Sequence, residues 1–339
     1  MNRILVAVGL GVLTPVTLIA GVAIGSVDVS AGDALSVFLS RLGTGAEASP
    51  TADAIVWDLR LPRVLMAMIV GGSLAVVGVA MQALVRNPLA EPYILGLSSG
   101  SAAGAATYYL GYLPAFAMGM LSMPVAAFLG GLLTITLVYG VARTDQGLSV
   151  TRLLLAGVAM SALMAAITSF VMLTSPEPNR MRAVLYWLMG SLSATRWSML
   201  ATPALVAVLG SVVLAGLSRP LDALLMGEEP ARALGVPVER MKHLLIVLAA
   251  LMTGVMVAYS GAIGFVGLIV PHAVRSVVGV SHRVVIPVSL VSGALFLVWA
   301  DLAARSVLSG QDLPVGIATA IAGVPFFLML LRRHRYPFG

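Results

Sequence analysis

The sequence predicts an all-α protein embedded in a membrane, and three observations support that fold class. Of the 339 residues, 59% are hydrophobic and only 10% are charged, whereas a typical soluble domain is roughly 25% charged. The uncharged stretches are long enough for membrane helices, each of which needs about 20 mostly apolar residues. Cysteine is absent, so no disulfide framework or thiolate site can form. These features exclude a soluble enzyme, a nucleic-acid reader and a secreted disulfide scaffold.

The spacing of the charged residues predicts ten helices within a single domain, residues 1–339. The uncharged stretches cover residues 4–27, 64–85, 92–142, 153–176, 197–218, 243–274, 284–300 and 313–331. The third stretch, of 51 residues, has room for two helices, and the sixth is broken at Tyr259-Ser260-Gly261-Ala262-Ile263-Gly264. The first stretch is longer than the apolar core of about 7–15 residues in a signal peptide, so we expect a retained helix.

The distribution of basic residues predicts the orientation in the membrane. With the N-terminus in the cytoplasm, ten helices bring both termini to that side, and the inside segments hold 13 of the 20 basic residues. This bias follows the positive-inside rule, and it explains the net charge of +6 without nucleic acid. Arg60, Arg63 and Arg305 fall outside. They either anchor helix ends at lipid headgroups or act on the outer face.

Two connecting segments are too long or too polar to be simple turns. Residues 28–62 form an external segment, in which we expect a short surface helix near residues 29–39. Residues 219–242 carry eight charges and form the largest cytoplasmic segment. Their pattern predicts two short helices with a corner at Gly227-Glu228-Glu229-Pro230. This segment is either a solvated loop or, as we favour, a docking surface for another protein.

Little in the sequence indicates chemistry within the chain. The only lysine, Lys242, follows no glycine-rich loop, so no phosphate-binding loop of the G-x-x-x-x-G-K-[ST] type is present. The four histidines show no metal-ligand spacing, and we expect no metal site. Asp301 and Arg305, four residues apart, are predicted to form a structural pair on one helix face. Gly71, Gly72 and Gly78 are typical of close helix packing in lipid.

Several motifs occur in a consistent order between about residues 59 and 330. They are Leu59-Arg60-Leu61-Pro62-Arg63, Asn87-Pro88-Leu89-Ala90-Glu91-Pro92, Trp187-Leu188-Met189-Gly190-Ser191, Gly227-Glu228, Leu234-Gly235-Val236, Ser260-Gly261, Pro271-His272, Asp301 with Arg305, and Pro314-Val315-Gly316. With these motifs the chain resembles the FecCD-type permeases, the membrane subunits of bacterial ABC importers for iron-siderophore complexes, haem or cobalamin.

The resemblance implies a cobalamin-permease-like bundle in the bacterial cytoplasmic (inner) membrane. It implies a homodimer with the translocation path between the two copies. Two ATP-binding subunits on the cytoplasmic side would bind ATP and Mg, and a soluble substrate-binding protein would dock on the outer side. The chain itself would bind no cofactor and would not be an enzyme.

The resemblance also assigns roles to particular residues. Arg60, Arg63 and Arg305 match the external arginines that receive acidic residues of the binding protein. Asn87 and Leu89 match one part of the cytoplasmic gate, and Val150 and Thr151 match the other. In the cobalamin permease we would expect two small hydroxyl residues at the second part, and Val150 replaces one of them. The coupling residues that would contact the ATPase are Leu221, Leu225, Gly227, Glu228, Glu229, Ala231, Leu234 and Gly235.

The resulting expectation is the membrane subunit of an ATP-driven importer that works by alternating access. Haem or a ferric siderophore is the expected substrate, with cobalamin as the alternative of the same type. An ion-coupled secondary transporter is the alternative from another class, and a non-transporting membrane scaffold is the third. Fold-level analogy alone carries the choice of substrate.

Overall fold

The protein is described by a computed structural model that covers residues 3–25, 27, 29–41, 43–44, 48–145, 147–175, 177–307 and 312–333. The expectation that both termini are cytoplasmic concerns chain ends that lie outside these residues. In this part of the chain, seven helices are long and apolar enough to cross a membrane. They contain α1 (Arg3–Ala23), α4 (Leu61–Val85), α7 (Met123–Ala142), α8 (Val150–Leu173), α10 (Ala201–Gly216), α13 (Val238–Ser260) and α15 (His282–Ser306). The span of α10 reaches its length of 20 residues only with the turn directly before it, from Trp197.

Each of the other three predicted membrane segments also contains a helix, although its apolar part is too short: two of these helices have 13 residues, and the apolar part of the third is Val315–Leu330. The three helices are α5 (Leu97–Tyr109), α14 (Val266–Val278) and α16 (Val315–Arg333). α5 begins late because the chain first forms the 3-10 turn η2 (Pro92–Leu95). α14 begins late because residues 261–265 are not helical. The predicted number of ten thus describes apolar helical segments, and seven of them reach spanning length.

Short elements connect the long helices. They are α2 (Ala31–Arg41), α3 (Pro50–Asp53), the π-helical turn η1 (Ala54–Arg60), α6 (Ala115–Met120), the hairpin β1 (Arg143–Thr144) and β2 (Gly147–Leu148), α9 (Pro178–Leu188), η3 (Trp197–Met199), α11 (Ser218–Leu225) and α12 (Glu228–Ala233). α2 lies in the predicted external segment, and α11 and α12 lie in the segment 219–242. Glu228-Glu229-Pro230, expected in the corner between the two helices, forms the first turn of α12 instead.

The helix that contains α4 begins much earlier than charge spacing predicts. α3, η1 and α4 run on from one another as one apolar helix of 36 residues, Pro50–Val85. The charge-based boundary at residue 64 is wrong because it treats the charged residues of this helix, such as Arg60 and Arg63, as a connecting loop. Both arginines are buried and hydrogen-bonded, so they are compatible with a continuous helix.

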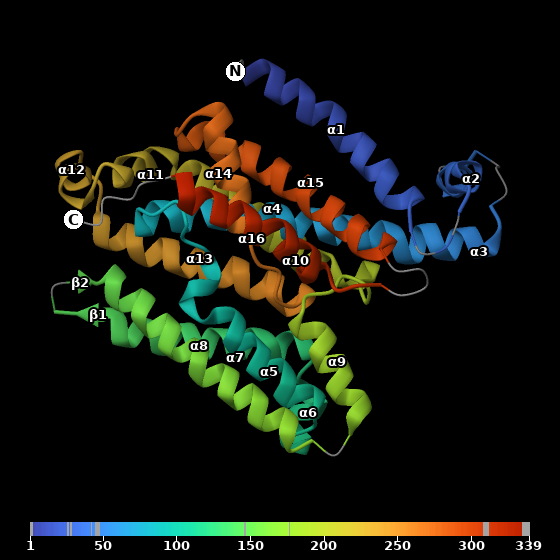
Figure 1. The fold of residues 1–339 in the computed structure, drawn as a ribbon, viewed down its shortest axis with the longest axis horizontal. Helices are drawn as coiled ribbons and strands as arrows, with labels where there is room; N and C mark the ends of the chain where they lie inside the picture. Colours follow the sequence, from blue (N-terminus) through green and yellow to red (C-terminus); the bar gives the residue numbers. More distant parts are fainter. Residues whose placement is uncertain are drawn as a thin grey trace.

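α4 is the central helix of one half of the bundle, in which it contacts α10, α13, α14 and α15 (Figure 1). The other half contains α5, α7 and α8, which contact one another, and α13 joins the halves by packing on both α4 and α7. Close packing at the three α4 glycines is confirmed. A Cβ at Gly71 would lie only 2.3 Å from the carbonyl oxygen of Gly293. At Gly78 it would lie 2.0 Å from that of Gly267, and at Gly72 it would lie 2.8 Å from that of Leu290.

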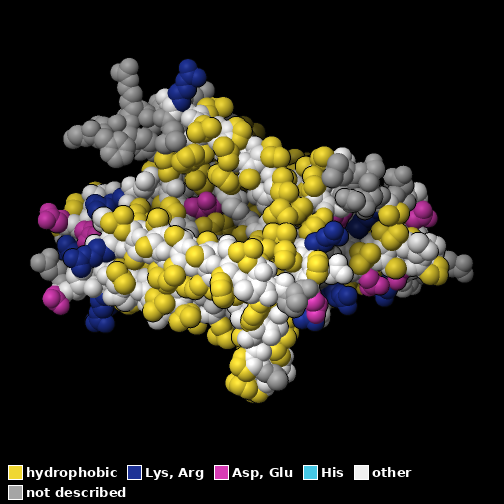
Figure 2. Space-filling model, turned by 60° about the horizontal axis from the view of Figure 1, so that its bottom comes forward, with side chains coloured by type: hydrophobic (Ala, Val, Ile, Leu, Met, Phe, Trp, Pro, Cys, Tyr) yellow, Lys and Arg dark blue, Asp and Glu magenta, His cyan; other side chains and the backbone are white. Residues whose placement is uncertain are grey.

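Charged side chains gather at the two ends of the long axis, and hydrophobic side chains dominate the surface between them (Figure 2). One end carries α2 and α3, and the other carries α11, α12 and the hairpin (Figure 1). We call them the α2 end and the α12 end. An apolar belt between two charged ends is the surface that a lipid bilayer requires.

Candidate functional site

Three arginines meet at the α2 end, where they line a cavity of about 180 Å³. Arg60 comes from η1, Arg63 from the first turn of α4 and Arg305 from the last turn of α15. Their exposed fractions are only 5%, 9% and 3%. These side chains therefore act first within the protein, and their partners define the site.

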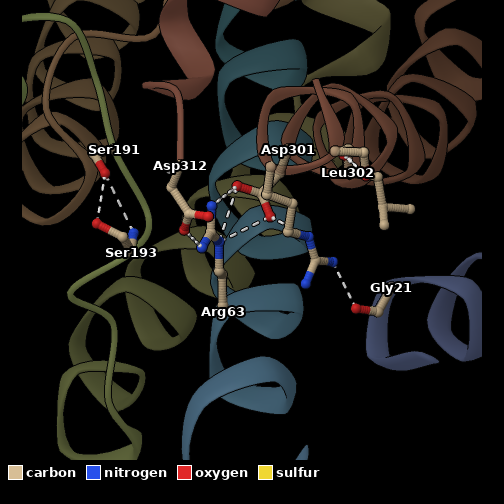
Figure 3. Close-up of polar contacts among 9 residues, drawn as sticks. Gly21, Arg63, Ser191, Ser193, Asp301, Leu302 and Asp312 are labelled. Carbon is tan, nitrogen blue, oxygen red and sulfur yellow. Dashed lines mark hydrogen bonds and ion pairs between the residues drawn. The ribbon is translucent and has the colours of Figure 1, made fainter. Parts of the chain in front are cut away.

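Arg63 contacts two carboxylates, Asp301 and Asp312. Its Nε and Nη2 donate to Asp301 at 3.0 and 2.9 Å, and its Nη1 donates to Asp312 (Figure 3). The predicted pair within α15 is present but longer, with 3.6 Å between Nε of Arg305 and Oδ2 of Asp301. Asp301 thus ties α15 to α4. A bidentate contact of this kind between a guanidinium and a carboxylate is geometrically specific.

The other two guanidinium groups bind the end of α1. Arg60 Nη1 donates to Val22 O and Ala23 O at 2.9 and 2.7 Å, and Arg305 Nη2 donates to Gly21 O at 2.6 Å. These carbonyls belong to the last turn of α1, where the backbone has free acceptors. The cluster therefore joins α1, α4 and α15 through these three arginines and the two aspartates, Asp301 and Asp312.

The residues predicted to form the gate lie at the α12 end in two separate turns. Asn87 follows the left-handed residue that ends α4, and its Oδ1 accepts a hydrogen bond of 2.9 Å from the Leu89 N–H. Val150 and Thr151 open α8, directly after Ser149, whose Oγ caps that helix by accepting from the Arg152 N–H at 3.3 Å. Val150 and Thr151, together with the end of α4, line one polar cavity of about 320 Å³.

Most of the predicted coupling residues fall into a buried set, which includes Gly227, or an exposed set, and Glu228 is half-buried. Leu221 and Ala231 are completely buried against the bundle. Leu225 and Leu234 are exposed, as are Glu229 and Gly235, and the Leu234 exposed fraction reaches 66%. The buried set fixes α11 and α12 on the bundle, while the exposed set presents apolar and acidic groups outward. Such a mixed surface fits a protein partner.

Asp222 fixes α11 to the beginning of α15. Its Oδ1 accepts a hydrogen bond of 2.9 Å from the His282 N–H and lies 2.6 Å from Nδ1 of the same histidine, whose side chain is completely buried. Within the described residues, no three His, Asp or Glu side chains gather closely enough to hold a metal ion.

Glu91 and Tyr93 each bind the segment between α13 and α14, a contact that the sequence motifs do not reveal. Oε1 of Glu91 accepts a hydrogen bond of 2.6 Å from the N–H of Phe265, which has a left-handed backbone with φ of 69°. The Tyr93 hydroxyl donates to Ile263 O at 2.7 Å. Together they hold the non-helical segment between α13 and α14. Glu91 lies outside the long apolar helices, and burial raises the pKa of its carboxyl to about 7 although the Phe265 N–H lowers it.

A helix bundle with an apolar belt, two charged ends and a buried ionic cluster defines a multi-pass membrane protein. The particular family follows from comparison with known proteins. The chain belongs to the FecCD transport family, whose model matches residues 13–333. It is a permease subunit of an ABC importer, and that family implies an ATPase and a binding protein as partners.

Similarity to named relatives extends over most of the chain. The cobalamin import system permease BtuC of Halobacterium salinarum is 46% identical over 83% of this chain and 74% of its own. The hemin transport system permease HmuU of Yersinia pestis is 40% identical over 84% of this chain and 86% of its own. A solved structure, described as an inward-facing conformation of an ABC transporter assigned to the metal-chelate type, is 31% identical, with a TM-score of 0.82 over 96% of this chain and 98% of its own.

Proposed function

We propose that this permease moves a metal tetrapyrrole across the cytoplasmic membrane, with cobalamin as the first candidate and haem as the second. The support is that a relative named for cobalamin is 46% identical and one named for hemin is 40% identical. Cobalamin thereby comes ahead of haem and the ferric siderophores, which are the first expectation from family analogy. Both ligands are bulky, rigid chelates and would need a wide path with few directional contacts.

The path lies between two copies of the chain, and ATP is hydrolysed by two separate subunits. The α12 end faces the cytoplasm, where exposed Leu225, Glu229 and Leu234 contact the ATPase. The observation that carries this assignment is that α11 and α12 are anchored by buried Leu221 and Ala231 yet expose an apolar and acidic surface. The two turns that contain Asn87 and Val150 act as the gate at this same end.

The binding protein docks on the α2 end, over the cavity lined by Arg60, Arg63 and Arg305. Three guanidinium groups line this cavity, and such a basic lining favours an acidic partner. Asp312 also lines this cavity and contacts Arg63, so an acidic side chain that enters the cavity would compete with Asp312 for that arginine. Docking would then be sensitive to salt.

Reconstitution tests this function directly. Proteoliposomes that contain the permease, its ATPase and its binding protein should accumulate radiolabelled cyanocobalamin or hemin only when ATP is present. Omitting the ATPase or replacing the lysine of its phosphate-binding loop should abolish uptake. Accumulation driven by a proton or sodium gradient without the ATPase would overturn the proposal in favour of a secondary transporter.

A further inference from the structure

Lys242 is the only lysine among the 20 basic residues of the chain, and it is buried. It lies in the first turns of α13, with an exposed fraction of 4%. A buried ammonium group is costly unless carboxylates and hydrogen-bond acceptors surround it. The identity of those partners therefore shows what the residue does.

Three acceptor groups from three different elements surround the ammonium. Glu228, the first residue of α12, contacts it through both oxygens at 2.8 and 2.9 Å. Glu239 of α13 contacts it at 3.0 Å, and the carbonyl of Leu148 in β2 accepts at 3.3 Å. A tetrahedral ammonium can direct its three hydrogens to three such groups, whereas the flat guanidinium of arginine presents its donors in one plane.

The same cluster holds both backbone groups of Leu148. While its carbonyl accepts from Lys242, its N–H donates to Oε2 of Glu239 at 2.9 Å. Gly147 lets the carboxylate approach, because a Cβ there would lie only 2.6 Å from Oε2 of Glu239 and φ is 109°. Leu148 directly precedes Ser149, the residue that caps α8. Lys242 and Glu239 thus fix the residue that precedes the beginning of α8, where the predicted gate residues Val150 and Thr151 lie.

The end of α4, which leads into the turn with the predicted gate residues Asn87 and Leu89, lies next to the cluster of Lys242, Glu228 and Glu239. Arg86, which ends α4 just before Asn87, lines the cavity of about 320 Å³ together with Glu228, Glu239 and Lys242. A Cβ at Gly227 would lie 3.7 Å from Nη1 of Arg86. The end of α4 directly before Asn87, the beginning of α8 and the beginning of α12 therefore border one polar cavity.

We propose that Lys242 is a positioning residue that transmits movement of α12 to the gate, an inference that rests on the proposed importer function. The ammonium joins Glu228 of α12 to Leu148 of the hairpin before α8. Arg232 supports the cluster through contacts of 3.0 Å with Glu228 and 3.8 Å with Glu239, so two positive charges balance two negative ones. When the ATPase displaces α12, Glu228 moves Lys242, and Lys242 moves the hairpin. Without the ammonium, Arg232 is the cation that still contacts the two carboxylates, and the direct link from Glu228 to the Leu148 carbonyl is lost. Movement of α12 is then transmitted to the hairpin less tightly.

The test uses the complete transporter with the Lys242→Met variant and, as a matched control, Arg283→Met. Arg283 is an exposed basic residue at the start of α15, so the control also removes one positive charge. For Lys242→Met we expect ATP hydrolysis to persist while uptake of cyanocobalamin or hemin per ATP falls about tenfold or more. Arg283→Met should keep the wild-type ratio.

Two further measurements separate coupling from folding and from the function itself. Hydrogen exchange should show faster exchange of the Leu148 amide in Lys242→Met, with α13 beyond its first turns unchanged. The double variant Glu228→Gln/Lys242→Met should be no worse coupled than Lys242→Met alone, because both changes remove the same contact. A wild-type ratio of uptake to hydrolysis in Lys242→Met would overturn this inference. Wild-type uptake without ATP would instead overturn the proposed function.

Discussion

Arg63 and Asp301 show how single residues connect helices that lie far apart in the sequence. They are separated by 238 positions, yet two nitrogens of Arg63 reach Asp301 at 3.0 and 2.9 Å. Breaking a buried pair of this kind leaves an uncompensated charge, which typically costs about 3–5 kcal/mol. Substitutions of Arg63 would therefore change the stability of the helix bundle as well as any docking of a binding protein.

Glu91 predicts a measurable dependence of stability on pH. Its pKa in the folded chain is about 7, against an ordinary value of 4.5. Because the folded-state pKa is raised, its contribution to stability is fully present below about pH 4.5 and is lost as the pH rises through 7. Replacing it with glutamine removes this titration. The thermal midpoint of wild type should therefore fall, relative to that of Glu91→Gln, between about pH 5.5 and pH 8.

Glu177→Gln is the control for this measurement, because Glu177 is exposed and outside the helix core. The gap between wild type and Glu177→Gln should stay constant over the same range. A gap between wild type and Glu91→Gln that does not widen with pH would show that the Glu91 carboxyl keeps its ordinary pKa.

At the scale of elements, α4 depends on glycines where it meets its neighbours. A Cβ at Gly78 would lie 2.0 Å from Gly267 O of α14, so Gly78→Ala must push the two helices apart. We expect it to lower the free energy of unfolding by about 1–3 kcal/mol, measured by denaturation in detergent micelles. Gly140→Ala on α7 is the matched control, since nothing lies within 4 Å of that position.

Gly140→Ala should leave the stability unchanged or raise it slightly, because alanine favours helix over glycine by roughly 0.5–1 kcal/mol. Equal changes in the free energy of unfolding for the two variants would mean that the close approach of α4 and α14 at Gly78 adds no cost to Gly78→Ala. The comparison therefore isolates close approach from helix propensity.

The sequence predicts where the helices lie along the chain better than it predicts their lengths and their contacts. The charge-free stretches each contain a helix because burying a charge in lipid is costly. The same rule misplaced the start of the α4 helix, since Arg60 and Arg63 are neutralised or hydrogen-bonded inside the protein. Pairing of Asp301 with Arg305 could be predicted because helix geometry sets it locally. Pairing of Asp301 with Arg63 could not, because it depends on how distant helices pack.

The candidate sites show the same limit. The motif around Glu91 is visible in the sequence. The contact of the Glu91 carboxyl with Phe265, however, requires a left-handed backbone at Phe265, which no sequence pattern predicts. The sequence identified Lys242 only as evidence against a phosphate-binding loop. Its partners Glu228, Glu239 and Leu148 come from three elements, so the cluster appears only when those elements are placed in space.

At the scale of the whole molecule, the orientation in the membrane can be tested with cysteine, which the chain lacks. A single Met226→Cys, at a residue 67% exposed between α11 and α12, should react with a membrane-impermeant maleimide only in inside-out vesicles. Leu35→Cys, at a residue 59% exposed on α2, should react only in right-side-out vesicles. The opposite result at both sites would invert the proposed orientation.

The buried lysine has a consequence for chemical labelling. Because the one ε-amine of the chain is enclosed by Glu228, Glu239 and the Leu148 carbonyl, reagents such as N-hydroxysuccinimide esters find no exposed lysine on the described surface. Acylation of Lys242 requires the ammonium to leave both glutamates and lose a proton. The rate of that acylation in the assembled transporter would report, through one residue, how often α12 separates from the hairpin during each cycle of ATP hydrolysis.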